Sequence, residues 1–395
     1  MTGAYDICIV GGGIQGCGLA QAAAAAGHRV ALLEQTTLAS ATSSRSSKLI
    51  HGGLRYLESA QFGLVAKSLR ERDLLLSLAP ELVHRVPFYI PVYKQSTRRP
   101  WQVRAGLSLY AVLGRLKATA CFHHIPQQRW DHLYGLKQTD LQAVYQYWDA
   151  QTDDAKLTRA VMYSACELGA ELLCPAEFQQ ARLTEHGYEI TYRQNDHEAS
   201  LLSQTLVNAT GPWVSEVQAA VLPTVPAPAI ELVAGTHIVL NQAPPGGVFY
   251  VESPSDQRAV FIMPWYGQTL VGTTERAYQG DPAQIVASEH EIEYLLAIVR
   301  YYFPRYSQDV ERAFAGARVL PRSEKSLFHR TRETLFFTHA QLPGYVALMG
   351  GKLTGYRLAA LKALAYLQAT LPSRTPRADT ATIKLHPVEQ WDVGC

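Results

Sequence analysis

The sequence predicts an α/β protein in which the two ends of the chain share one type of fold and the middle forms a β-rich unit. Residues 6–34 run as a buried strand, an alanine-rich helix and a second strand, which make a βαβ unit of about 30 residues. Residues 345–371 repeat the order of strand, glycines and helix. Residues 235–274 instead hold successive short strands separated by turns rich in Pro and Gly, a pattern typical of antiparallel pairing.

The segments between these units carry further elements. Apolar spacing of the helical type recurs in three places, and two more strands are expected before the β-rich middle. The predicted helices cover residues 62–78, 154–169 and 287–303, and the predicted strands cover 183–192 and 200–209.

Composition excludes several classes of protein. The 395 residues are 47% hydrophobic, which suffices for about two or three domains, and 36 basic against 34 acidic residues give no reason to expect nucleic-acid binding. The six cysteines form no C-x-x-C pair and no metal-ligand spacing, so they are expected to be reduced thiols of a cytoplasmic protein, with no metal site. No apolar stretch is long enough to span a bilayer.

The first turn of the chain carries a dinucleotide-binding fingerprint. Residues 11–16 match G-x-G-x-x-G between a strand and a helix, and Glu34 ends the next strand, 21 residues after Gly13. The glycines permit a tight turn that approaches a pyrophosphate, and Glu34 can accept hydrogen bonds from the adenosine ribose. The fingerprint by itself does not separate FAD from NAD.

Together these observations predict a Rossmann-like cofactor domain into which a β-rich α+β substrate domain is inserted. The cofactor domain is expected to be discontinuous because both chain ends carry its type of element. It is expected to comprise residues 1–85, 150–230 and 335–395, and the substrate domain residues 86–149 and 231–334.

A longer set of motifs points to one family. Residues 42–57, Thr-Ser-Ser-Arg-Ser-Ser-Lys-Leu-Ile-His-Gly-Gly-Leu-Arg-Tyr-Leu, resemble the signature of FAD-dependent glycerol-3-phosphate dehydrogenases, which belong to the D-amino-acid-oxidase-like superfamily. Further matches follow in the family's order at residues 208–213, 235–239, 264–265, 272–274, 316–318 and 350–354. Two departures stand out. Family members usually carry a further C-terminal helical domain of roughly 100 residues, a common size for a small domain, and this sequence ends without it. The family's Thr-Thr-Tyr-Arg motif is Thr-Gly-Tyr-Arg at residues 354–357.

The resemblance implies non-covalent FAD. Hydroxyls and a lysine within residues 43–48 are expected to surround the pyrophosphate, and residues 208–211 to bring backbone close to the cofactor. The amides of residues 350–354 are expected to face the pyrimidine end of the flavin, where a helix N-terminus stabilises the negative charge of the reduced ring. The expected FAD-binding residues are Gly11, Gly13, Ile14, Gln15, Gly16, Glu34, Thr42, Ser43, Ser47, Lys48, Leu49, His51, Gly52, Ala209, Thr210, Gly211, Trp213, Gly351, Lys352, Leu353 and Thr354.

The resemblance also implies a phosphate subsite. A phosphate dianion calls for guanidinium groups, and Arg55 and Arg318 lie in family motifs. A third arginine is expected in residues 327–337, where the alignment is ambiguous between Arg330 and Arg332, of which Arg332 is the candidate.

Three more side chains complete the expected site. His237, in the match at residues 235–239, is the candidate base, because neighbouring cations depress its pKa and keep the imidazole neutral. Lys352 is a further cation, and Tyr56 is expected to orient the substrate.

These residues predict hydride removal from C2 of sn-glycerol 3-phosphate to flavin N5, yielding dihydroxyacetone phosphate, with quinone or another acceptor taking the electrons. Two alternatives stay open. One is an oxidase of another small anion, a 2-hydroxy acid or an amino acid, and the other is a flavin subunit that needs a partner chain. Oligomeric state is not indicated.

An apolar helix at residues 105–114 has two interpretations. It is flanked by Arg98, Arg99, Arg104, Arg115 and Lys117. Such a segment suits the surface of the cytoplasmic membrane face, and a buried core helix explains it equally well.

Overall fold

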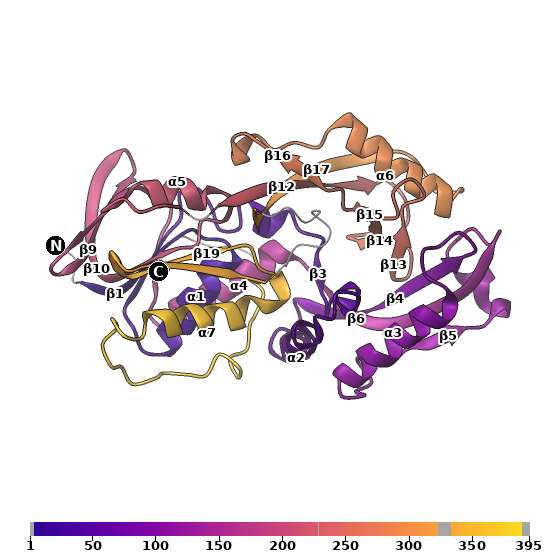
Figure 1. Ribbon diagram of the computed structural model, residues 1–395, viewed down its shortest axis with the longest axis horizontal. Coiled ribbons are helices and arrows are strands. Elements are labelled where there is room, and N and C mark those ends of the chain that lie inside the picture. Colours follow the sequence, from indigo (N-terminus) through magenta and orange to yellow (C-terminus); the bar gives the residue numbers. More distant parts are fainter. Residues whose placement is uncertain (1–3, 228, 323–332, 389–395) are drawn as a thin grey trace.

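The computed structural model describes residues 4–227, 229–322 and 333–388. Its described part contains two β-sheets that lie toward opposite ends of the long axis of the molecule (Figure 1). Helices cover both sheets, and the predicted α/β class with a β-rich second region is confirmed.

The first sheet has a parallel core in the order β7-β2-β1-β10-β19. Its central strands β1 and β2 are fully buried, mostly apolar runs, as is typical of parallel strands covered on both faces. The strands of this core are β1 (Tyr5–Val10), β2 (Val30–Leu33), β7 (Glu171–Leu173), β10 (His197–Asn208) and β19 (Leu342–Met349). Antiparallel β18 (Leu335–His339) extends the β19 edge.

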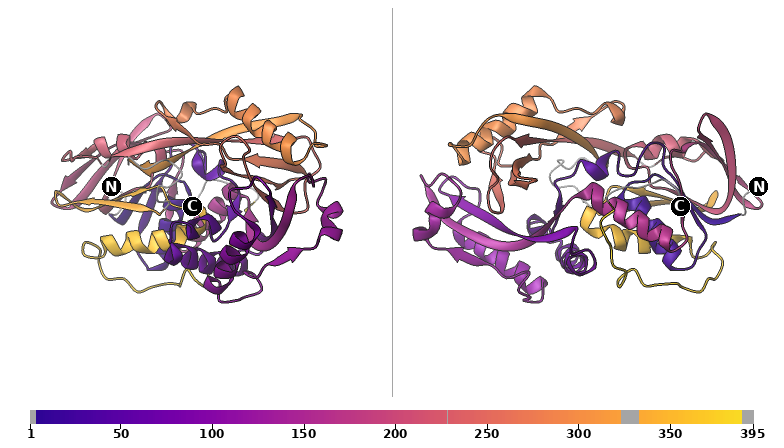
Figure 2. Two further views of the ribbon diagram at one scale, coloured as in Figure 1. Left: turned by 45° about the vertical axis from the view of Figure 1, so that its right-hand side comes forward. Right: turned by 180° about the vertical axis from the view of Figure 1, so that it is seen from behind.

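Helices pack on one face of this core. Helix α1 (Ile14–Ala25) lies between α4 (Asp154–Glu167) and α7 (Tyr356–Leu367), as the views in Figures 1 and 2 show. Its alanines leave little side-chain bulk, so the neighbouring helices approach closely, and nearly the whole helix is buried. This packing fixes the direction in which the N-terminus of α1 points.

A β-layer and a short helix cover the other face. Strand β8 (Glu177–Thr184) pairs with β9 (Gly187–Gln194), which pairs with the first half of β10, while α5 (Val214–Ala219) follows β10 and β11 (Val221–Leu222) pairs with β8. The single strand predicted at residues 183–192 was wrong, because the chain turns at 185–186 and the apolar alternation belongs to two strands of one hairpin.

The second sheet is mostly antiparallel and is built from two groups of strands. One group surrounds β12 (Ile230–Leu240), which pairs with β15, β16 and β17. The other contains β4 (Val83–Tyr93) and β6 (Leu141–Thr152), two long strands that the sequence did not indicate. The remaining strands are β3 (Leu49–Ile50), β5 (His123–Ile125), β13 (Val248–Glu252), β14 (Ala259–Trp265), β15 (Gln268–Gly272), β16 (Arg276–Tyr278) and β17 (Val310–Pro321).

Three helices pack on this second region (Figure 1). Helix α6 (Glu289–Tyr302) lies against β12, and its first turn is closed by a reciprocal capping box between Ser288 and Glu291. Helices α2 (Phe62–Leu78) and α3 (Pro100–Leu113) contact each other on the side of β4 and β6.

Helix α3 divides into a buried and an exposed face. Leu107 and Tyr110 are fully buried, whereas Trp101 and Val112 are 69% and 59% exposed. Helix α3 is therefore not a core helix buried on all sides. Within the described residues, no helix is long and apolar enough to cross a membrane.

Candidate active site

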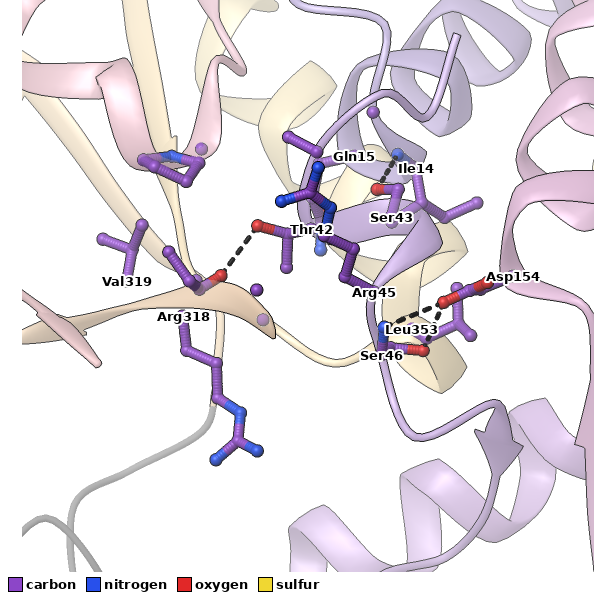
Figure 3. Close-up of a pocket in the computed structure, with 18 of the residues that line it drawn as sticks. Ile14, Gln15, Thr42, Ser43, Arg45, Ser46, Asp154, Arg318, Val319 and Leu353 are labelled. Carbon is purple, nitrogen blue, oxygen red and sulfur yellow. Dashed lines mark hydrogen bonds between the residues drawn. The ribbon is translucent and has the colours of Figure 1, made fainter. Parts of the chain in front are cut away.

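A cavity of about 570 Å³ opens where the two sheets meet. One wall is the carboxyl ends of β1, β2 and β10, which is where open parallel sheets bind ligands. The opposite wall is formed by β12 and β17 of the second sheet. Figure 3 shows part of this wall, with Arg318 and Val319 extending to opposite sides of β17.

The glycine turn has the backbone that a pyrophosphate site requires. Gly11 adopts φ +109°, a conformation that side chains rarely allow. A Cβ on Gly16 would lie 1.9 Å from the carbonyl oxygen of Gly11, so the third glycine lets α1 pack against the turn. Gly16 therefore acts through packing and does not line the cavity.

Glu34 and Ser43 complete this end. Glu34 Oε2 accepts from the Gly12 amide at 2.8 Å, which holds the carboxylate beside the turn. Ser43 Oγ accepts from the Ile14 amide at 2.9 Å, at the N-terminus of α1 (Figure 3). An amide at a helix N-terminus suits an anion, and both side chains line the cavity.

Other hydroxyls of the loop at residues 42–47 bond to protein groups. Thr42 Oγ1 donates to the Ala317 carbonyl at 2.7 Å, which ties the loop to β17. Ser46 Oγ donates to Asp154 at 2.6 Å, and Ser47 Oγ lies 3.0 Å from His237 Nε2.

Lys48 does not line the cavity. Its ammonium group forms a buried ion pair with Asp154 at 2.6 Å and also donates to the Ser44 carbonyl. The expected contact of Lys48 with a pyrophosphate does not fit this arrangement, because Asp154 already neutralises the ammonium. Lys48 instead anchors the loop to the start of α4.

Two further turns complete the cofactor wall. Residues 209–213 follow β10, and Thr210 Oγ1 bonds to Asn208 at 2.6 Å, which fixes the turn. Residues 350–354 follow β19, and Gly350 and Gly351 adopt φ +67° and +96°, so the backbone itself faces the cavity.

The His51–Gly52 backbone is held from behind by a buried network. The Gly52 amide donates to the hydroxyl of Tyr110 at 3.0 Å, and that hydroxyl donates to Asp149 at 2.7 Å. Arg72 neutralises Asp149 from the other side at 2.7 Å. His51 is half-buried and lines the cavity, and loss of solvation together with the charges of Lys352 and Arg55 lowers its pKa to about 3. Gly52 itself lies behind the wall.

Three of the cations expected from the sequence line the cavity. Arg55, Arg318 and Lys352 all line the cavity, although they come from three separate segments. The Lys352 ammonium lies 3.7 Å from the centre of the Tyr56 ring, a cation–π contact. Arg318 Nη1 pairs with Glu275 at 2.7 Å.

His237 lies close to Arg318 and Lys48 and is 1% exposed. Burial is the largest cause of its altered pKa, followed by the charges of Arg318 and Lys48, and together they lower the pKa to about 3. The imidazole is therefore neutral at physiological pH and able to accept a proton.

Of the expected residues, Arg332 and its alternative Arg330 lie outside the described residues. Every other expected residue lines the cavity except Gly16, Lys48 and Gly52. Sequence reasoning missed Arg45, Asp154 and Glu275, which also line it. Glu275 directly follows the motif at residues 272–274, and Arg45 lies inside the motif at 42–57. Their positions in or beside family motifs could have indicated that these two residues belong to the site.

The site fits FAD. The positive-φ turn at Gly11, the amide end of α1 and the Glu34 carboxylate provide groups for a pyrophosphate and a ribose, in a cavity shared with a second sheet. These features define a Rossmann-type dinucleotide-binding protein.

Comparison with known proteins gives the family. The model of the FAD dependent oxidoreductase family matches residues 6–367, and the chain belongs to that family and uses FAD. It is 37% identical, over 92% of this chain and 72% of the relative, to a glycerol-3-phosphate dehydrogenase of Pseudomonas aeruginosa. A D-erythritol 1-phosphate dehydrogenase of Brucella abortus is 34% identical over 93% of this chain and 74% of its own. The glycerol-3-phosphate dehydrogenase of Bacillus halodurans complexed with FAD superimposes with a TM-score of 0.76 and 25% identity, over 97% of this chain and 68% of that one.

Proposed function

We propose that this chain oxidises sn-glycerol 3-phosphate to dihydroxyacetone phosphate and passes the electrons to quinone or another acceptor. The observation that carries the proposal is the presence of Arg55, Arg318 and Lys352 around one cavity that also contains a neutral histidine and the FAD-fitting turn. One arginine suffices for a carboxylate, whereas several cations suit a phosphate dianion.

The cations bind and orient the substrate. A guanidinium offers five donors in one plane, so Arg318 can hold phosphate oxygens while it keeps the bond to Glu275. Arg55 and Lys352 add positive charge, and Tyr56, under the Lys352 ammonium, restricts where that ammonium lies. Holding the phosphate fixes the position of C2 relative to the base.

The neutral His237 removes the hydroxyl proton as the C2–H bond breaks. A base must be unprotonated before the reaction, and the low pKa of His237 ensures this across the physiological range. When bound, FAD supplies the hydride acceptor at N5, and the backbone at residues 350–354 would stabilise the charge that then develops on the pyrimidine ring.

The names of relatives support the substrate class. Both relatives named above act on a polyol phosphate according to their names, one on glycerol 3-phosphate and one on D-erythritol 1-phosphate. The name of the D-erythritol 1-phosphate dehydrogenase makes a longer polyol phosphate a specific alternative. The cations bind the phosphate, so the length of the polyol that is accepted depends on the rest of the cavity.

The test is anaerobic mixing of the purified yellow protein with a panel of compounds while flavin absorbance is followed. Glycerol 3-phosphate should bleach the flavin fastest. Faster bleaching by D-erythritol 1-phosphate would change the substrate, and bleaching only by 2-hydroxy acids or amino acids would overturn the proposal. Slow turnover that lysate or membranes accelerate would indicate a partner chain.

We further propose that the exposed face of α3 contacts the cytoplasmic membrane face, where quinone is dissolved. Trp101 and Val112 give this face an apolar centre, and Arg99, Arg104 and Arg115 supply positive charge around it. Lys117 contributes less, because it pairs with Asp73 at 3.1 Å. Arg98 does not contribute in the same way, because Glu58 and Glu252 pair with it.

A further inference from the structure

Ser47 and His237 form a contact that the proposed roles above do not use. Ser47 precedes β3, and His237 lies in β12, 190 residues later. Their side chains are in contact, with Ser47 Oγ 3.0 Å from His237 Nε2. Both side chains line the cavity.

The imidazole ring is held in one place. Phe314 stacks on it with ring centres 5.1 Å apart and planes inclined by 11°. Gly272, its cross-strand neighbour, lies so close that a Cβ there would be 2.0 Å from the ring. The ring is therefore packed against both Phe314 and Gly272.

Access to the two ring nitrogens is unequal. His237 Nδ1 is buried and has no hydrogen-bond partner among the described residues. Its Nε2 makes the contact with Ser47, so the hydroxyl of Ser47 stands at the nitrogen through which the ring can exchange a proton. A substrate in the cavity would meet that hydroxyl.

We propose that Ser47 relays the substrate proton to His237, an inference that rests on the proposed oxidation of a secondary alcohol. The C2 hydroxyl proton passes to Ser47 Oγ as the Ser47 proton passes to His237 Nε2, leaving Ser47 neutral and His237 protonated. The hydride leaves C2 with both electrons of the C–H bond, bound FAD is the oxidant, and the C–O bond becomes a carbonyl. Protons and electrons balance without another reactant.

This arrangement assigns the neutral ring a defined tautomer. Nε2 must accept from Ser47, so Nδ1 carries the hydrogen in the resting enzyme. Lys48, the other cation beside the ring, does not line the cavity, whereas Arg318 does, so Arg318 is the charge that substrate phosphate would most alter. Bound phosphate would offset that charge and raise the proton affinity of His237 when the relay must operate.

The test compares single-turnover flavin reduction by glycerol 3-phosphate in the parent, Ser47→Ala and Ser47→Thr, each with its FAD content measured. The relay predicts that Ser47→Ala slows reduction by about 10²-fold or more at saturating substrate, whereas Ser47→Thr, which keeps a hydroxyl, stays within about tenfold of the parent. Ser47→Ala at the parental rate would overturn the relay and leave the proposed function intact. A parent that the substrate does not bleach would instead overturn the proposed function.

Two further measurements separate a relay from mere support of the ring. The parental rate in mixtures of H₂O and D₂O should curve with deuterium content, because two protons move together, and a straight line would overturn the relay. In protein labelled with ¹⁵N-histidine, the His237 Nε2 signal, assigned by its loss in His237→Gln, should shift in Ser47→Ala without any substrate. An unchanged signal would show that no such hydrogen bond exists.

Discussion

Replacing Arg318 should weaken phosphate binding more than the loss of one hydrogen bond predicts. Arg318 Nη1 lies 2.7 Å from Glu275, whose side chain is only 7% exposed. Arg318→Ala removes both a donor to the phosphate and the cation beside this carboxylate. The carboxylate then faces the incoming dianion with less compensation.

The magnitude follows from these two terms. A lost hydrogen bond to a charged group costs about 1.5–3 kcal/mol, which is about 10- to 150-fold in KM. Repulsion by Glu275 adds to this, so the upper part of the range is expected. The double variant Arg318→Ala/Glu275→Gln should recover part of the loss, because the amide is neutral.

The assay is anaerobic flavin reduction at varied substrate concentration, which separates KM from the limiting rate. If Arg318 binds the phosphate equally in ground and transition states, KM rises and the limiting rate changes little. Glycerol, which has no phosphate, is the control substrate and should be affected much less. An equal loss with glycerol, or a double variant no better than the single one, would refute this reasoning.

Three further outcomes are expected. Acid precipitation should release the flavin into the supernatant, since FAD is held without a covalent bond; flavin in the pellet would contradict this. The protein should co-sediment with anionic vesicles more than with neutral ones, salt should weaken this, and Trp101→Ser with Val112→Ser should reduce it while leaving flavin content unchanged. The free energy of unfolding should fall as the pH drops from about 6.5 toward 3. In this range His51 and His237 become protonated in the unfolded chain but stay neutral in the folded protein. Each histidine adds a slope of up to about 1.4 kcal/mol per pH unit, and urea unfolding should show a smaller slope for His237→Gln; an unchanged slope would argue against the low pKa.

The local elements were predictable because their signals are local. Glycine spacing, an alanine-rich helix and apolar strands specify the turn at residues 11–16 within about 30 residues of chain. Helix α2 has the bounds predicted for it, residues 62–78. Strands β4 and β6 were not predicted, because residues such as Pro87 in β4 and Asp149 in β6 do not give the pattern of an isolated strand. The two strands form as a long antiparallel pair.

By itself, the sequence determined the class of fold, the cofactor turn and many of the residues that line the cavity, since each of these sits in a short motif. Only the tertiary structure decided which partner each of them meets. Lys48 pairs with Asp154, Ser47 meets His237, and Arg318 pairs with Glu275, across separations of 106, 190 and 43 residues. Such contacts depend on how segments that are distant in the chain meet in the folded protein. An ammonium, a hydroxyl or a guanidinium can bind a ligand or another side chain with the same chemistry, so the spacing of residues along the chain does not show which of the two it binds.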